Sequence, residues 1–413
     1  MTKKFFLLFL LFGLTLITLS QEHNLEFYIS EGIRNSPLLN DYRNQVNSAI
    51  ADSLLIRAAK RPFIEAKSQL QYSPVYGSFG YDEVITDGGN YMAVMGVSQS
   101  IFNKKELTNK YEAVEIQKQA IRNSSNISTS ELKRTITAQY LTTFSGYDDY
   151  QFNKTFVALF YKENAIVKEF VKNGICKQTD YLSLLIEAQS QEILVSQLKN
   201  QYRKELMFLN QLCGLNDSSL YDLTAPLIAV NGIPDIEKTQ IYIQYKIDSI
   251  RIANEKLAID IRYKPKVSWF ADAGVLTHDP LNFYNHFGYS VGLSLNIPVY
   301  DGNQRVIEKR KLEYNENSRQ GYQNNYRIVY SQQFRQLYDE LKSLDELSNR
   351  MKEQLLSSEM LINALKQQLE SGIIQMTDYI IAIKTFKTTS RNLNLVNIQK
   401  LQVKNEMNFL LTQ

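Results

Sequence analysis

The sequence predicts a mainly α-helical fold with a transmembrane β part, made of two structural repeats. Three observations predict it. A segment of the first half recurs in the second half, pairs of segments alternate between apolar and polar residues as strands do, and the stretches between them are rich in helix-forming residues. With only 17 glycines and 8 prolines in 413 residues, few positions interrupt these helices. Each repeat is therefore expected to contain a pair of membrane strands and long coiled-coil helices.

The first twenty residues have the pattern of an export signal. Two lysines precede an apolar run over 5–19, and small residues follow up to Ser20. We expect a signal peptide over 1–20 and a mature chain that begins near Gln21; the alternative, a retained transmembrane helix, is disfavoured by the short run. Beyond Ser20 there is no apolar run of about 18 residues, so a membrane crossing by the mature chain has to use strands.

Two landmarks show the repeat with one common offset. The segment 172–181 (KNGICKQTDY) recurs as 370–379 (ESGIIQMTDY), and 97–103 recurs as 295–301. Both pairs lie 198 residues apart, as 370 − 172 and 295 − 97 show. Chance explains two distant matches in one register poorly, so the chain contains an internal duplication.

The duplication divides the mature chain into a first repeat over 22–215, a linker over 216–236 and a second repeat over 237–413. In each repeat we expect a helix, two strands, a very long helix, a glycine turn and a returning helix. The expected strands are 63–73 and 90–101 in the first repeat, and 266–276 and 287–299 in the second.

The strands of the second repeat alternate most cleanly. Their apolar positions, which we expect to face lipid, are Trp269, Tyr289, Val291, Leu293, Leu295 and Ile297. A soluble sandwich has the same alternation, but four strands cannot close a membrane barrel, which takes about eight or more. Because open sheet edges are excluded from lipid, the hairpins must be pooled between subunits.

The helices are too long for a compact domain. From about Lys104 to Val171 only an Asn- and Ser-rich patch at 123–130 suggests a break, and 1.5 Å per residue predicts a rod on the order of 100 Å. In the second repeat, apolar residues over 334–369 follow heptad spacing, with Ser348 and Ser358 at two of the places. The helices are expected to pack side by side as coiled coils.

Composition excludes most other classes of function. Charge is nearly balanced, with 46 basic and 43 acidic residues and no basic arm, so no nucleic-acid partner is expected. No nucleotide-binding loop, metal-site motif or catalytic motif occurs, and the three histidines lie near the expected cleavage point or in a loop. We expect no enzyme activity, no cofactor and no metal site. Cys176 and Cys213 could be free thiols or a disulfide, with free thiols favoured.

The whole mature chain resembles the TolC family of outer-membrane efflux proteins. The resemblance rests on Asn35–Leu38 with the helix that follows, on Pro298–Gly302 at the return from the strands, and on the paired tips at Gly174 and Gly372.

The resemblance implies a homotrimer in which each chain gives four strands to a twelve-stranded β-barrel in outer-membrane lipid, continuous with an α-helical periplasmic barrel. It implies a passive exit duct of a Gram-negative bacterium, for efflux of small molecules or type I protein secretion. A periplasmic adaptor (membrane fusion) protein and an inner-membrane transporter would be its partners.

The resemblance also implies roles for the two hairpin tips. Asp180 and Asp378 would ring the periplasmic aperture, although first-turn acids also suit the helix dipole. The tip and adaptor-contact residues would be Gly174, Ile175, Thr179, Gly372, Ile373, Ile374 and Thr377. The glycines would supply positive φ and the threonines would cap the returning helices, and packing between hairpins is the alternative role of the isoleucines. The chain departs from the family pattern at Leu184 and Ile381, where many members have alanine and some an acid, so an acidic filter would be sparser here.

Two other readings remain open. A periplasmic adaptor is exported and has a helical hairpin, but this chain has the hairpin twice. An exported coiled-coil scaffold without a channel would leave the alternating strands without a purpose.

Overall fold

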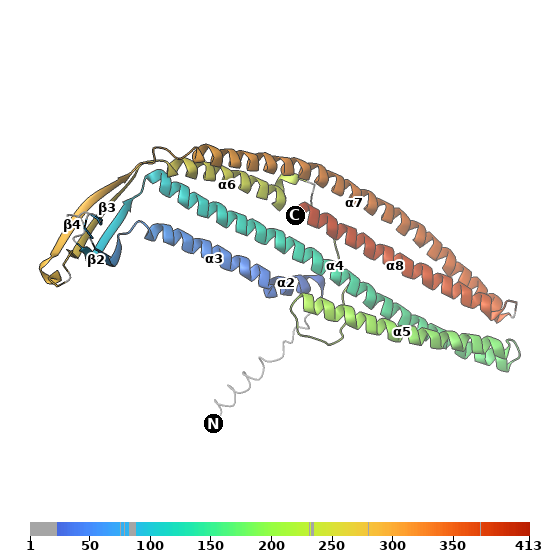
Figure 1. The fold of residues 1–413 in the computed structure, drawn as a ribbon. Helices are drawn as coiled ribbons and strands as arrows, with labels where there is room; N and C mark the ends of the chain where they lie inside the picture. Colours follow the sequence, from blue (N-terminus) through green and yellow to red (C-terminus); the bar gives the residue numbers. More distant parts are fainter. Residues whose placement is uncertain are drawn as a thin grey trace, which may run out of the picture. The chain divides into compact units, whose positions relative to one another are not determined.

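The computed structural model describes residues 23–74, 76–77, 79–81, 88–230, 232, 235–279, 281–371 and 373–413 (Figure 1). The expected signal peptide, Gly372, and residues 231, 233 and 234 of the expected linker lie outside the described residues. The described chain consists mainly of long helices together with a small antiparallel sheet. No helix in these ranges is both long and apolar enough to span a membrane.

The chain forms two compact units. Among the described residues, those within 1–40, 126–240 and 327–413 form one unit, and those within 41–125 and 241–326 form the other. We call them the helical unit and the sheet unit. The two very long helices, α4 (Lys104–Lys172) and α7 (Gln304–Glu370), contribute one part to each unit.

The sheet unit holds four antiparallel strands in the order β1-β2-β3-β4. Their bounds are β1 Phe63–Ser73, β2 Gly88–Ile101, β3 Lys266–Thr277 and β4 Phe287–Asn296. The hairpin of each repeat joins the other through the β2–β3 ladder, which leaves β1 and β4 as the edges. A short helical turn, η2 (Phe283–Asn285), lies in the β3–β4 loop.

The last strand is shorter than the alternation predicts. β4 ends at Asn296, so Ile297, which we expected on the lipid-facing strand, lies just outside it. Pro298 explains the early end, because proline has no N–H to donate to a ladder and fixes its own φ.

Each strand pair returns into a long helix through a capped turn. Before α7, Gly302 and Asn303 take φ of +64° and +67°, and the Asp301 carboxylate accepts from the backbone N–H of Asn303 at 2.9 Å and of Arg305 at 2.8 Å. Before α4, the Asn103 side chain accepts from the N–H of Lys105 at 3.0 Å. Side-chain oxygens thus satisfy N–H groups that the first helical turn cannot pair.

Two further helices complete the sheet unit, α3 (Pro37–Ala58) and α6 (Gln240–Arg262). Pro37 opens α3, a position that suits its fixed φ and missing N–H. α6 packs beside the first part of α4, where the Asn109 amide donates to the Asn254 carbonyl at 3.0 Å and the Asn254 amide returns a bond to the Asn109 carbonyl at 3.3 Å.

The helical unit contains α2 (Leu25–Asn35), α5 (Gln178–Leu212), η1 (Ile236–Lys238), α8 (Met376–Thr412) and the later parts of α4 and α7. α4 continues without a break through the Asn- and Ser-rich patch at 123–130. The low helix propensity of these residues does not end the helix there. On α7, every heptad position from Phe334 to Leu369 is buried or half-buried, including the two serines, of which Ser348 is 1% exposed.

A tyrosine-rich core anchors the linker to the helical unit. The Tyr28 and Tyr221 hydroxyls lie 2.6 Å apart, and the Tyr140 hydroxyl donates to the Thr224 carbonyl at 2.7 Å. From Leu215 to Val230 the chain has no regular structure, so these bonds satisfy polar groups of a segment that lacks a ladder of its own. Both cysteines are free thiols.

Candidate functional site

The first hairpin tip is a tight turn between α4 and α5. Gly174 has a φ of +73°, in the left-handed region that side chains disfavour. The backbone N–H of Ile175 donates to the Phe170 carbonyl at 2.9 Å and closes the end of α4. This is the glycine-dependent helix end expected from the sequence.

Asp180 holds the start of α5. Its carboxylate accepts a hydrogen bond from the backbone N–H of Lys177 at 2.9 Å. Thr179, the expected cap, lies one position inside the helix instead, because α5 begins at Gln178 and the residue before it is Lys177. Asp180 therefore caps the helix at this tip. Its negative charge also interacts favourably with the positive N-terminal end of the helix dipole.

The second tip has the same layout with a weaker cap. α8 begins at Met376, so Thr377 again lies inside the first turn rather than before it, and Asp378 follows in the position that corresponds to Asp180. Within the described residues, no hydrogen bond to the Asp378 carboxylate matches the one that Asp180 makes. Gly372 lies outside the described residues, so its left-handed conformation stays a prediction.

The tip isoleucines divide into two kinds. Ile175 is 45% exposed and Ile373 is 73% exposed, whereas Ile374 is half-buried and packs against the apolar core beneath the tips. Two of the three expected contact residues therefore present apolar surface to solvent, and the third takes part in packing between the hairpins.

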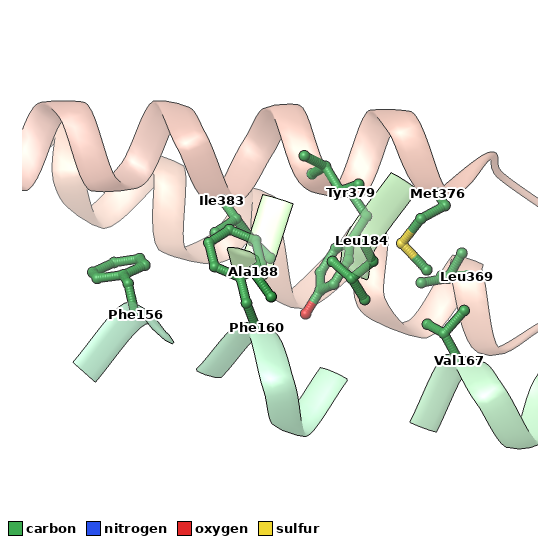
Figure 2. Packing of buried hydrophobic residues seen from close by; sticks show 10 residues of the cluster. Phe156, Phe160, Val167, Leu184, Ala188, Leu369, Met376, Tyr379 and Ile383 are labelled. Carbon is green, nitrogen blue, oxygen red and sulfur yellow. The ribbon is translucent and has the colours of Figure 1, made fainter. Parts of the chain in front are cut away.

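An apolar core lies directly beneath the tips and joins both hairpins. Figure 2 shows its side chains gathered between the ribbons of α4 and α8. Its buried members come from four helices: Phe156, Phe160, Val167, Leu184, Ala188, Leu369, Met376, Tyr379, Ile380 and Ile383. Leu184, the position that the resemblance marks as a departure from alanine, is fully buried, so its side chain fills the core.

Ion pairs between the hairpins flank this core. The Lys366 ammonium of α7 lies 2.8 Å from a carboxylate oxygen of Glu163 on α4. On α8, Lys384 lies 2.7 Å from Glu187 of α5, and Arg391 lies 3.3 Å from Asp149 of α4. In all three pairs the first repeat supplies the acid and the second repeat supplies the base.

Burial perturbs two groups within this set of contacts. Lys387 donates to Gln191, and burial lowers the pKa of its ammonium, an effect that Glu187 partly offsets. Burial, and then the neighbouring Asp149 carboxylate, raise the pKa of Asp148, while the bond from the Asn394 amide at 2.8 Å acts in the opposite direction.

The sequence analysis did not single out these ion pairs. A signal was present, since Lys384 and Arg391 are seven residues apart and so share one face of a helix. Their acidic partners lie more than 190 residues away in sequence, as 384 − 187 = 197 illustrates. Helical periodicity alone does not identify a partner at that distance.

The sheet carries the second group of expected site residues. Trp269, Val291, Leu293 and Leu295 share one face with Tyr289, because the register pairs Trp269 with Leu293 and an even number of residues separates the others. The four β4 side chains are largely exposed, with Tyr289 at 86% and Leu293 at 76%, whereas Trp269 is half-buried. The Trp269 indole N–H donates to the Gln99 side chain at 3.0 Å. A continuous apolar face of this size on one chain marks an interaction surface.

No group of three or more His, Cys, Asp or Glu side chains in the part of the chain that the structure describes is arranged to hold a metal ion.

Comparisons with known proteins match the fold rather than the sequence. No family model matches the chain, and no curated protein matches it. CusC, whose structures concern transmembrane channel formation, has a TM-score of 0.74 at 12% identity, over 95% of this chain and 92% of that one. The outer membrane protein VceC of Vibrio cholerae has 0.72 at 13%, over 93% and 94%. The outer membrane channel CmeC of Campylobacter jejuni has 0.70 at 12%, over 94% and 86%.

These likenesses extend over nearly the whole length of each protein compared. At 10–14% identity and TM-scores of 0.70–0.74 they establish the fold. The chain therefore has the fold of the TolC-type outer-membrane channels, in agreement with the resemblance of its sequence.

Proposed function

We propose that this protein is a passive exit duct of the outer membrane of a Gram-negative bacterium. Three chains assemble, each contributing β1–β4 to a twelve-stranded barrel in outer-membrane lipid, and their long helices form a tube in the periplasm. The observation that carries the proposal is a four-stranded sheet with one exposed apolar face and two unpaired edges, in a chain with the fold of outer-membrane channels.

The unpaired edges support the assembly. In lipid, an edge strand without a partner leaves backbone N–H and C=O groups without hydrogen bonds, and each such group costs on the order of several kcal/mol of free energy. Because β1 and β4 are the two edges, β1 of one chain can pair with β4 of the next and close the sheet. Four strands from each of three chains reach the size that a membrane barrel requires.

The tips support a periplasmic role. Asp180 and Asp378 are in the first turns of two neighbouring returning helices, and three copies of each would place acids around one aperture. Ile175 and Ile373 offer exposed apolar surface for a periplasmic adaptor. An inner-membrane transporter would supply the energy, for small-molecule efflux or for type I protein secretion.

The division into repeats over 22–215 and 237–413, joined by a linker over 216–236, belongs to the same proposal.

The deciding experiment is to extract the protein from outer membranes with mild detergent and to measure mass by light scattering and shape by electron microscopy. An elongated trimer with a detergent belt at one end supports the duct. A monomer or dimer that needs no detergent overturns it and favours an adaptor or a coiled-coil scaffold.

A further inference from the structure

The face of the sheet opposite the apolar one contains a groove of about 660 Å³. Among its lining residues are Glu65, Met92, Val94, Phe270 and Asp272. All five side chains belong to the sheet unit and to one face, as the register of β1, β2 and β3 shows. In the proposed duct this face is turned toward the lumen.

Two acids flank an open floor in this groove. Gly96 of β2 pairs with Glu65 of β1 on one side and with Asp272 of β3 on the other, so the two acidic residues lie on the strands that flank β2. A Cβ added at Gly96 would meet its nearest atoms, the Asp272 Cβ and the Glu65 carbonyl oxygen, at 3.9 and 4.0 Å, which is ordinary van der Waals contact, so nothing crowds this position. Neighbouring strands are about 4.8 Å apart, so the two residues are separated by about 10 Å across a floor without a side chain.

The two acids are not equivalent. The Lys67 ammonium lies 2.7 Å from a Glu65 carboxylate oxygen, which neutralises that side of the groove. Asp272 instead accepts a hydrogen bond from the Ser290 hydroxyl at 2.9 Å, which orients its carboxylate without cancelling its charge. The net charge of these three groups is therefore −1, located at Asp272.

An aromatic ring lies beside the uncompensated acid. Phe270 is two residues before Asp272 on β3, so both side chains project from the same face, about 7 Å apart along the strand. Its ring lies against Gly292 of β4, where an added Cβ would come within 2.5 Å of the ring. The ring is still 39% exposed, so part of its surface is open to a ligand.

We propose that this groove binds a flat organic monocation, with its charge between Asp272 and the Phe270 ring and its apolar body over Gly96, Met92 and Val94. A cation is attracted both by a carboxylate and by the face of an aromatic ring. An anion is disfavoured, because the Lys67 ammonium is already paired with Glu65 and the Asp272 carboxylate would repel it, although His286 also lines the groove. The inference deepens the proposed function by naming a class of cargo, and it rests on that function for placing the groove in a lumen.

The test is equilibrium binding to the detergent-solubilised full chain, followed by fluorescence anisotropy. Rhodamine 6G, a cationic xanthene dye, is compared with fluorescein, an anionic dye with a related ring system. We expect rhodamine 6G to bind and fluorescein to bind at least about threefold more weakly, with the difference shrinking as salt is added.

Two variants assign the binding to the groove. Asp272→Asn keeps the shape and can still accept the Ser290 bond, and Phe270→Leu keeps an apolar side chain without a ring. Each is expected to weaken rhodamine 6G binding about twofold to fivefold. The matched control is Asp339→Asn, an acid exposed on α7 outside the groove, which should bind as the wild type does.

Equal binding of the two dyes, or wild-type binding by both variants, overturns the inference. If Phe270→Leu does not fold, Asp272→Asn alone decides, since its isosteric amide leaves the sheet contacts in place. Planar-bilayer recordings on the same preparation separate this result from the duct itself. Ion conductance without dye preference rejects the groove and keeps the duct, whereas dye preference without conductance supports the groove and rejects the duct.

Discussion

Glu163 and Lys366 form an ion pair in which only one partner is deeply buried. Their charged atoms lie 2.8 Å apart between α4 and α7, and the Glu163 side chain is 6% exposed against 36% for Lys366. Removing the exposed base would leave the buried acid without its partner, and that is costlier than losing a surface pair.

We therefore expect Lys366→Met to lower the free energy of unfolding by about 1–3 kcal/mol, since methionine keeps the apolar stem and removes only the charge. Circular dichroism during urea unfolding of the detergent-solubilised protein measures the change. The control is Lys172→Met, because Lys172 and Glu169 are each about 60% exposed and such pairs contribute little. Equal effects in the two variants would show that the hairpins do not depend on the buried pair.

Two glycine substitutions should act in opposite directions. Gly174→Ala places a Cβ on a residue with φ of +73° and should cost about 1 kcal/mol, although the surrounding space is open. Gly321→Ala lies inside α7 with open space around it and should stabilise by about 0.5–1 kcal/mol. Thermal unfolding of both variants provides the comparison, and a stabilised Gly174→Ala would contradict the assigned tip geometry.

The tip acids should set ion preference through charge rather than through helix capping. In Asp180→Asn with Asp378→Asn, the amide oxygen can still accept the Lys177 bond that Asp180 now accepts. We expect the double variant to keep wild-type stability and to lose part of its cation preference in planar-bilayer recordings. Unchanged reversal potentials in a salt gradient would leave the acids with a capping role only. Asp339→Asn is the control for a loss of charge elsewhere.

Adjacent positions on β4 should differ sharply in their tolerance of charge. Leu293 lies on the exposed apolar face and Ser294 on the opposite one. Leu293→Arg should reduce insertion into outer membranes, because arginine facing the lipid midplane costs about 2–4 kcal/mol. Ser294→Arg should insert as the wild type does. Fractionation and heat-modified mobility on gels measure both, and equal insertion of the pair would argue against lipid contact on this face.

Acid should weaken the sheet unit through Glu316. Hydrogen bonds from Arg319 at 2.8 Å lower the pKa of this carboxyl to about 2, helped by a bond from Gln320 at 2.9 Å. Because the pKa in the folded protein lies below the ordinary glutamate value of 4.5, the stabilisation is present above pH 4.5 and is lost as the pH falls toward 2.

Glu316→Gln should therefore flatten the fall in melting temperature between pH 4.5 and 2. Glu313→Gln, exposed three residues earlier on α7, is the control and should follow the wild type. A wild-type slope in Glu316→Gln would assign the acid sensitivity to other groups.

Features that depend on nearby residues were predictable from the sequence. The alternation over 266–299 identified which side chains share a face, since successive residues of a strand point to opposite sides. The heptad positions of α7, including Ser348, were buried as the spacing indicates. The ends of strands were predicted less accurately. Ile297 lies outside β4 because Pro298 has no N–H to donate to a hydrogen-bonded ladder.

The periodic elements and the glycine turn at Gly174 could be predicted from the amino-acid sequence, because each depends on residues only a few positions apart, and the internal repeat could be predicted because two copies of one segment can be compared directly. Tertiary structure alone decided that β2 pairs with β3, that Lys366 meets Glu163, and that Phe270 lies over Gly292 beside Asp272. Such contacts join segments far apart in the chain or side chains on different strands. Their partners are selected by the geometry of packing, which local periodicity does not encode.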